Sequence, residues 1–377
     1  MTISGRKQIK AGEILPGIRW VTAARYADGM IRSVCLGIVA LATALPGLAQ
    51  EKPTSKYFRV GAAQDMAAKT TPGYALMGGG ADLDEAFRWL CARAGGGDFL
   101  VLRAAGTEAY NPYISGLEDG KGCKLNSVAT LVIPSREAAA EPFVAEAIRH
   151  AEAIFIAGGD QANYVRFWMG TPVQREINAA IARGVPVGGT SAGLAVLGEW
   201  AYSAEGDGPG DANLDSATAL KDPLGPRVTL VHGFLEIPVL KGIITDSHFV
   251  KRDRMGRLLV FLADVNRPEP KEKFDGRQIR GLGIDQEAAV LLRPNGAAEV
   301  VGKGSAYLVE PAKSMTSPVA GVALDSGPFL VQRIRSGERF DLFHVGEVGD
   351  FLQFIVAHGV VGSSPAGVSP YGRDAAQ

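Results

Sequence analysis

The sequence predicts an α/β protein with a mainly parallel sheet covered by helices on both faces, followed by a β-rich C-terminal extension. Short runs that are apolar throughout alternate with helical segments, which is typical of parallel strands buried on both faces. Several of these runs end in glycine-rich turns, and ligands of such sheets bind beyond the carboxyl ends of the strands. We therefore expect the functional residues to lie at those ends.

The elements expected in the first part of the chain alternate regularly. The expected strands are residues 74–77, 99–102, 129–133, 153–157, 185–188, 228–231 and 242–245. The expected helices include residues 82–90, 141–151, 192–197 and 250–263. From residue 282 onward the sequence is β-rich, and a hairpin is indicated where residues 288–292 and 299–301 flank Pro294-Asn295-Gly296. Residues 329–331 and 340–343 continue this β-rich character.

The first 49 residues differ from the rest of the chain. Residues 34–45 form an apolar run that is too short to span a bilayer comfortably. Arg32 precedes the run and small residues ending at Ala49 follow it, a pattern typical of a secretory signal peptide. A translation start at Met30 would give this signal an ordinary length. We expect a secreted or periplasmic protein with no stable membrane association; a membrane anchor or a buried helix is the alternative.

The remainder divides into four segments by composition. Residues 50–72 are polar and indicate a linker, and residues 73–310 form the main α/β domain. Residues 311–362 form the β-rich extension, and residues 363–377 indicate a loose tail.

Charge and cysteine content narrow the function classes. The formal net charge of −1 offers no basic surface for nucleic acid. Cys91 and Cys123 remain after signal cleavage, and an oxidising compartment permits a disulfide between them without requiring it. Two cysteines at this spacing are no metal signature, and we expect neither a metal nor a cofactor. The sequence leaves the oligomeric state open, and a homodimer is possible.

Ser191 stands at the centre of Gly189-Thr190-Ser191-Ala192-Gly193. This pentapeptide follows an apolar strand and precedes a small-residue helix, which is the context of a nucleophile elbow. The flanking glycines permit a tight turn. The N–H groups of Ala192 and of the Gly158-Gly159 turn would form the oxyanion hole. The pattern predicts Ser191 as the nucleophile of a serine hydrolase; a helix-capping serine or a phosphate-binding turn is the alternative.

His248 is the expected general base. It follows the strand at 242–245 and therefore belongs at the same edge as Ser191, whereas the other four histidines have positions that suggest structural roles. Arg252, Arg254 and Arg257 come directly after His248, and arginines can hold a carboxylate through two parallel hydrogen bonds. The alternative for these arginines is a solvated helix face.

Together these motifs resemble the cyanophycinase family of serine peptidases over about residues 73–310. The resemblance rests on Gly189–Gly193, on the run from Asp246 to Leu258, and on two further motifs, Gly158-Gly159-Asp160-Gln161 and Gly283-Ile284-Asp285-x-Glu287. The family implies a fold like that of class I glutamine amidotransferases, and no metal or cofactor. It also implies hydrolysis of cyanophycin, an aspartate backbone carrying arginine, to β-Asp-Arg dipeptides. The residues it places in the substrate pocket are Gln161, Asp246, Arg252, Arg254 and Arg257.

The sequence departs from the family at the acid that orients the histidine. The family has Glu directly after the Asp of the Gly-Ile-Asp motif, whereas this chain has Gln286 there and Glu287 one residue later. A one-residue bulge would bring Glu287 into place, so Glu287 is the expected acid, with Asp215 and Glu205 as rivals.

Three other functions remain open from the sequence. An Asp-specific dipeptidase would use the same catalytic residues. A non-catalytic binder of Asp-rich peptides would keep the fold, and Gln286 favours it. An α/β-hydrolase esterase shares the Gly-x-Ser-x-Gly pattern, but its histidine usually comes much later in the chain than His248 does.

Overall fold

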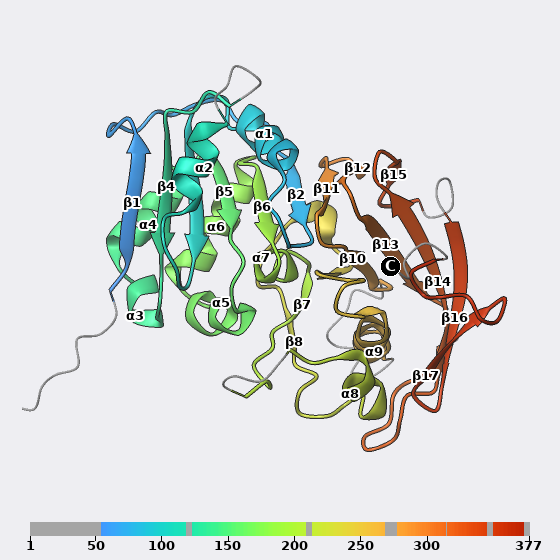
Figure 1. Cartoon of the computed structure of the whole chain (residues 1–377). Helices are drawn as coiled ribbons and strands as arrows, with labels where there is room; N and C mark the ends of the chain where they lie inside the picture. The colour runs from blue at the N-terminus through green and yellow to red at the C-terminus, as the bar shows by residue number, and fades with distance from the viewer. Residues whose placement is uncertain are drawn as a thin grey trace, which may run out of the picture. The chain divides into compact units, whose positions relative to one another are not determined.

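Two sheets form the framework of the structure, a computed structural model that describes residues 54–117, 123–208, 213–267, 277–313, 315–344 and 350–372 (Figure 1). The first sheet has nine strands in the spatial order β1 (Lys56–Gly61), β4 (Ser127–Val132), β3 (Asp98–Arg103), β5 (Ala153–Ile156), β6 (Val187–Thr190), β2 (Tyr74–Met77), β11 (Ala288–Leu292), β12 (Ala297–Gly302) and β15 (Arg339–Asp341). The run from β4 to β2 is parallel, and the strands on either side of it are antiparallel to their neighbours.

The second sheet has eight strands. Their order is β17 (Val360–Ser364), β16 (Asp350–Ala357), β14 (Ser326–Arg335), β13 (Ser305–Pro311), β10 (Arg280–Ile284), β9 (Ile243–Asp246), β7 (Trp200–Tyr202) and β8 (Leu230–His232). Only β10–β9 and β9–β7 are parallel pairs in this sheet. The chain crosses from the second sheet to the first between β10 and β11, so the turn at residues 285–287 lies where the two sheets meet.

Helices cover both faces of the parallel strands. Alternate residues of β2 point to opposite faces, so Ala75 and Met77 share a core with α1 and α2, whereas Leu76 shares another with α3 to α6. A third core joins α8 and α9 to the second sheet. The helices are α1 (Asp84–Arg93), α2 (Tyr110–Gly116), α3 (Arg136–Ala139), α4 (Pro142–Arg149), α5 (Gln161–Trp168), α6 (Pro172–Ala182), α7 (Ala192–Ala195), α8 (Ser216–Lys221), the 3₁₀ helix η1 (Pro238–Leu240) and α9 (Met255–Val265). The predicted α/β class, with its β-rich C-terminal region, is confirmed.

Three of the predicted segment assignments need correction. Residues 56–61 of the expected linker form β1, an edge strand whose partial exposure leaves no strong apolar pattern in the sequence. The expected boundary after residue 310 falls within β13, which pairs with β14, so the extension adds strands to the second sheet and one strand, β15, to the first. In the expected loose tail, Tyr371 is buried and its hydroxyl donates to Asp253 Oδ1.

Two further features of the described residues are the lack of a membrane-spanning helix and the presence of a disulfide. None of the helices within the described ranges is long and apolar enough to cross a bilayer. The predicted signal region, residues 1–49, lies outside the described residues. Cys91 and Cys123 form a disulfide, with their Cα atoms 5.2 Å apart. It ties α1 to the segment that leads into β4.

Candidate active site

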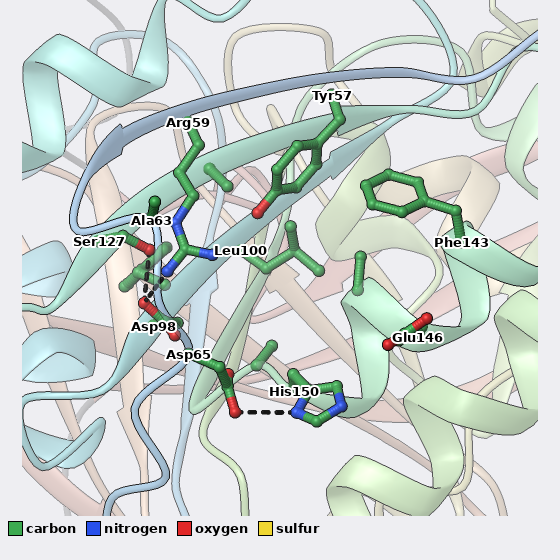
Figure 2. Close-up of a pocket in the computed structure, with 14 residues that line it drawn as sticks. Tyr57, Arg59, Ala63, Asp65, Asp98, Leu100, Ser127, Phe143, Glu146 and His150 are labelled. Carbon is green, nitrogen blue, oxygen red and sulfur yellow. Dashed lines mark hydrogen bonds and ion pairs between the residues drawn. The ribbon is translucent and has the colours of Figure 1, made fainter.

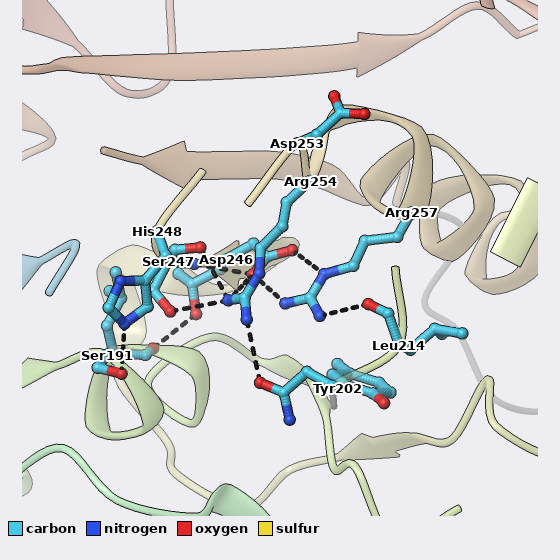
Figure 3. A network of polar contacts seen from close by, with 12 residues as sticks. Ser191, Tyr202, Leu214, Asp246, Ser247, His248, Asp253, Arg254 and Arg257 are labelled. Carbon is cyan, nitrogen blue, oxygen red and sulfur yellow. Dashed lines mark hydrogen bonds and ion pairs between the residues drawn. The ribbon is translucent and has the colours of Figure 1, made fainter. Parts of the chain in front are cut away.

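Ser191 and His248 meet although they come from different sheets. Ser191 directly follows β6 of the first sheet, and His248 lies two residues after β9 of the second. The Ser191 Oγ is 2.7 Å from His248 Nε2, a hydrogen-bonding distance between a nucleophile and its base (Figure 3). The structure thus brings together the two residues that the sequence proposed as the catalytic pair.

The backbone at the end of β2 joins the two residues. Met77 O accepts a hydrogen bond from Ser191 N–H at 3.2 Å, and the next carbonyl, Gly78 O, accepts one from His248 N–H at 2.7 Å. Gly79 O accepts a third from Glu287 N–H at 2.8 Å. Three consecutive carbonyls of the segment Met77–Gly79 therefore hold three segments that are far apart in the sequence.

The three residues held in this way share an uncommon backbone conformation. The φ angles of Ser191, His248 and Glu287 are 54°, 48° and 53°, in the left-handed region that residues other than glycine rarely adopt. Such conformations cost free energy and persist where the surrounding structure imposes them, often at functional sites. The hydrogen bonds from Met77–Gly79 are part of what imposes them here.

The glycines on either side of Ser191 permit close packing of the elbow. A Cβ on Gly193 would lie 2.0 Å from Ile156 O, so only glycine lets α7 approach β5 this closely. A Cβ on Gly189 would lie 2.7 Å from the Gly193 carbonyl carbon. Each glycine thus makes room for backbone, and the Gly-x-Ser-x-Gly pattern follows from sterics.

Gln286, and not Glu287, faces the second ring nitrogen of the base. The Gln286 side-chain amide nitrogen is 2.6 Å from His248 Nδ1. Glu287, the predicted acid, instead accepts a hydrogen bond from Lys303 Nζ at 2.7 Å. This corrects the sequence prediction: β10 pairs with β9 so that Gly283 lies opposite Asp246, and in the turn that follows it is Gln286 that contacts the ring.

The two rival acids do not take the place of Glu287. Asp215 caps α8, where its carboxylate accepts hydrogen bonds from the backbone and side chain of Thr218. Glu205 is exposed. Within the described residues, the group that contacts His248 Nδ1 is therefore a neutral amide.

Asp246 is enclosed by two of the three arginines (Figure 3). Arg257 donates to both carboxylate oxygens of Asp246, through Nε at 2.8 Å and Nη2 at 2.5 Å. Arg254 Nη1 donates to Asp246 Oδ1 at 3.3 Å and to the Ser247 carbonyl oxygen at 2.9 Å. All three charged side chains are almost completely buried. Arg254 and Arg257, which were predicted to bind substrate, thus donate hydrogen bonds to Asp246 within the protein.

Arg252 differs from these two arginines because it is exposed. Its side chain has no hydrogen bond or ion pair among the described residues. Gln161, the first residue of α5, is buried at the carboxyl end of β5, next to the strand that carries Ser191. Among the described residues, Arg252 and Gln161 are therefore the members of the predicted pocket whose side chains have no hydrogen bond or ion pair.

The charges around His248 oppose its protonation. Burial lowers its pKa first, and Arg252 and Arg254 lower it further, to about 4, against the weaker effect of Asp246. For Asp246, burial alone would raise the pKa, but Arg257 and Arg254 outweigh it and hold the pKa below its ordinary value. The imidazole is therefore neutral and the carboxylate charged at pH 7.

Backbone N–H groups are available beside Ser191 for an oxyanion. Ala192 is the first residue of α7, so its N–H has no partner within the helix. Gly158 is adjacent to the nucleophile, since a Cβ placed on it would lie 3.4 Å from Ser191 Cβ, and Gly159 follows it. The predicted oxyanion residues Gly159 and Ala192 thus lie in segments that border Ser191.

A separate hollow of about 440 Å³ lies beside β1, β3, β4 and α4 (Figure 2). It is bordered by the Arg59–Asp98 ion pair at 3.0 Å and by a contact of 2.9 Å between His150 Nδ1 and Asp65 Oδ2. None of the residues predicted to be functional lines it. Among the described residues no cluster of three or more metal-ligating side chains is found.

Comparison with known proteins agrees with this geometry. Residues 83–223, which include Ser191, match the sequence profile of peptidase family S51. A cyanophycinase of Geminocystis herdmanii is 30% identical over 193 residues, covering 50% of this chain and 60% of the relative. A cyanophycinase of Trichormus variabilis is 28% identical over 224 residues, covering 57% of this chain and 65% of the relative. Residues 83–223 of the chain are thus similar to peptidase family S51, and the two relatives named are cyanophycinases.

These matches are partial. The chain spans 60–65% of the length of these two curated relatives. Among solved structures, a peptidase from an acI-B1 actinobacterium is 19% identical, with a TM-score of 0.46, over 73% of this chain and 98% of the other.

Sequence reasoning missed two features of the site. The first is the contact between Gln286 and His248, which the parallel register of β9 and β10 determines. The second is the role of residues 77–79, whose only signal was a run of three glycines after an apolar strand. Neither carbonyl acceptors nor strand register can be recognised from side-chain types.

Proposed function

We propose that this protein is a serine peptidase that hydrolyses peptide bonds next to aspartyl residues, with cyanophycin as its substrate. The observation that carries the proposal is the 2.7 Å contact between Ser191 Oγ and a neutral His248 Nε2 on a strand-to-helix elbow. The similarity to cyanophycinases supports the choice of substrate.

The reaction begins with attack of Ser191 Oγ on the scissile carbonyl carbon, while His248 Nε2 takes the hydroxyl proton. The N–H groups of Ala192 and the Gly158-Gly159 turn stabilise the negative oxygen of the tetrahedral intermediate. The carbon–nitrogen bond then breaks, and His248 gives its proton to the leaving amine. A water molecule then attacks the acyl carbon while His248 Nε2 takes its proton. As the ester bond breaks, His248 returns that proton to Ser191 Oγ.

An acidic substrate fits the charges beside the nucleophile. Asp246 neutralises one of the two buried guanidinium groups that contact it, so the Asp246, Arg254 and Arg257 cluster keeps a net positive charge. The unpaired Arg252 adds a second positive charge. A carboxylate of the substrate would bind Arg252 and also reduce the repulsion that Arg252 exerts on the imidazolium.

We also propose that the protein is exported. The apolar run at residues 34–45 with its small-residue exit supports export, as does the Cys91–Cys123 disulfide, because disulfides persist mainly in oxidising compartments. N-terminal sequencing of the protein recovered from the medium or periplasm tests this proposal, and recovery of an uncleaved chain from the cytoplasm would contradict it.

The activity is tested by incubating the protein with cyanophycin, an Asp-X dipeptide and an aryl ester, and by identifying the products by mass. We expect β-Asp-Arg from cyanophycin and a loss of at least about a thousandfold in Ser191→Ala. Turnover of the dipeptide but not of cyanophycin would show that the substrate is a small peptide and not the polymer. No turnover of any substrate, combined with binding of Asp-rich peptide, would show a non-catalytic binder, which Gln286 in the acid position favours.

A further inference from the structure

The Gln286 amide is placed to control which nitrogen of His248 carries the proton. Its nitrogen is 2.6 Å from His248 Nδ1, and its side chain has no other hydrogen bond among the described residues. The oxygen and nitrogen of a glutamine amide exchange places on a half-turn of the last side-chain torsion. Each orientation offers the ring a different partner, a donor or an acceptor.

The two orientations have opposite consequences for Ser191. If the amide N–H donates to Nδ1, the ring proton must lie on Nε2, which then donates to Ser191 Oγ and cannot accept its proton. If the amide oxygen faces the ring, it accepts Nδ1–H, and Nε2 is left with a lone pair for the Ser191 hydroxyl. Only the second arrangement makes His248 a base.

We propose that Gln286 is a positioning residue for this site: in the reactive state its Oε1 accepts the Nδ1–H of His248, which leaves Nε2 free to take the proton of Ser191. The site is then a Ser–His–Gln arrangement in which a neutral amide selects the tautomer without adding negative charge. This inference rests on the proposed function, because tautomer selection has a catalytic consequence only if Ser191 is the nucleophile.

The position of Gln286 in the fold supports this role. The amide projects from the turn at residues 285–287, where the chain crosses from the second sheet to the first. On one side of this turn, Asp285 Oδ1 accepts a hydrogen bond from Val250 N–H at 2.7 Å. On the other side, Glu287 N–H is held by Gly79 O. Both neighbours are fixed by the segments that surround His248, so the Gln286 side chain is directed at the ring.

Several charged groups surround the His248 ring, whereas the side chain in contact with its Nδ1 is neutral. Asp246, Arg252 and Arg254 face it from β9 and the following turn, and Arg257 from α9. Asp285 and Glu287 flank Gln286, but Val250 N–H and Lys303 respectively occupy their carboxylates. The Met77–Gly79 segment brings no titratable group. A carboxylate at position 286 would therefore be the first negative charge in hydrogen-bonding contact with the ring, and it would stabilise the imidazolium.

The test uses the full chain labelled with ¹⁵N-histidine, with the His248 signals assigned by their loss in His248→Gln. Nitrogen chemical shifts report the tautomer and the pKa of the ring directly, and do not require turnover. Gln286→Met removes the hydrogen bond at similar length, and Gln286→Glu adds a charge. Glu287→Gln is the matched control, because it changes the adjacent side chain that contacts Lys303.

We expect the wild-type ring to carry its proton on Nδ1 at pH 7. Gln286→Met should lose this preference and reduce kcat at least tenfold, with KM changed less than twofold. Gln286→Glu should raise the pKa of His248 by at least one unit and move the acidic limb of the pH–rate profile with it. Glu287→Gln should change none of these quantities.

Two results would overturn the inference: an unchanged tautomer in Gln286→Met, or an unchanged His248 pKa in Gln286→Glu. A failure of the proposed function is distinguishable from this, since it appears as absent turnover in the wild type while the nitrogen shifts still respond to position 286. Melting curves of the variants identify any loss of folding.

Discussion

Two polar side chains near His248, those of Asp246 and Gln286, differ in charge, burial and hydrogen-bond partners. On the side of β9, Asp246 is buried and bonded to Arg254 and Arg257, so a full negative charge is held by two positive ones. On the side of the β10–β11 turn, the half-buried and uncharged Gln286 reaches Nδ1 through a single contact. The buried acid of this site therefore organises the arginines, and the base has a neutral partner.

This difference shows that proximity in sequence does not decide the role of an acid. Asp246 is two residues from His248, yet its oxygens are directed to Arg257 and Arg254. Removing one partner of a buried ion pair leaves the other charge uncompensated, which is costly, whereas losing a neutral hydrogen bond costs less. Substitutions in the Asp246 cluster should therefore mainly change stability, and substitutions of Gln286 should mainly change the catalytic rate.

The largest expected effect is on stability and comes from the arginine cluster. Arg257→Met should lower the free energy of unfolding by about 3–5 kcal/mol, because it leaves the Asp246 carboxylate buried without its bidentate partner. Urea denaturation monitored by circular dichroism measures the change.

Arg339→Met is the matched control, because Arg339 pairs with Glu299 in the open, with its side chain 77% exposed. Exposed pairs contribute about 0–1 kcal/mol. Equal losses in the two variants would refute the contrast between a buried and a surface pair. Gln286→Met should stay within about 1 kcal/mol of the wild type.

The next effect concerns the backbone that joins the two sides of the site. In Gly79→Ala, the new Cβ would lie 2.4 Å from His248 Cε1 and the backbone φ is +92°, so the ring must move. We expect a stability loss of about 1–3 kcal/mol from overpacking and a large fall in kcat. Melting temperature and steady-state kinetics measure the two changes.

Gly337→Ala separates the clash from the cost of positive φ. Its φ is +83°, but a Cβ there meets nothing within 4 Å. It should share the modest backbone penalty and keep full activity. If Gly79→Ala retained the wild-type kcat, the close packing of Gly79 on the base would not matter for catalysis.

A smaller effect is expected at Arg252, whose side chain has no hydrogen bond or ion pair among the described residues. Arg252→Gln should raise KM for an aspartyl substrate about tenfold to a hundredfold, because a charged hydrogen bond contributes about 1.5–3 kcal/mol. Stability should hardly change, since no bond within the described residues is lost. Lys251→Gln removes the same charge one residue away and should leave KM unaltered; a similar rise in both variants would indicate a general field effect instead of a contact.

The smallest expected effect is the pH dependence set by His248. Its pKa is lowered from 6.5 to about 4, so the ring stays a neutral base until the pH approaches that value. Since kcat/KM follows the free enzyme, it should fall as pH falls through about 4. Stability should also decline as pH falls from 6.5 towards 4, because the unfolded chain binds the proton first.

His358→Gln is the control for the pH dependence, since the His358 side chain is 92% exposed and, among the described residues, contacts Asp325. It should leave the activity profile unchanged. An acidic limb near pH 6.5 in the wild type would mean that burial and the arginines do not disfavour the imidazolium.

Much of the fold and part of the site could be predicted from local patterns. Strand β2 was expected at its observed bounds because it is apolar throughout and buried on both faces. Strand β1 was missed because an exposed edge strand has a weak pattern. Ser191 and His248 could be predicted as neighbours because each follows such a strand. The prediction of Glu287 as the acid was wrong because the direction in which a side chain leaves a turn depends on strand register and backbone angles.

The sequence by itself determined the elbow, since the glycines beside Ser191 are required by contacts with β5 and with each other. It also determined that a histidine and three arginines follow another buried strand. Only the tertiary structure decided that these strands belong to different sheets, that the carbonyls of Met77–Gly79 join them, and that Gln286 reaches the base. The physical reason is that a local pattern reports burial and periodicity. Which donor meets which acceptor depends on the pairing of segments far apart in the chain.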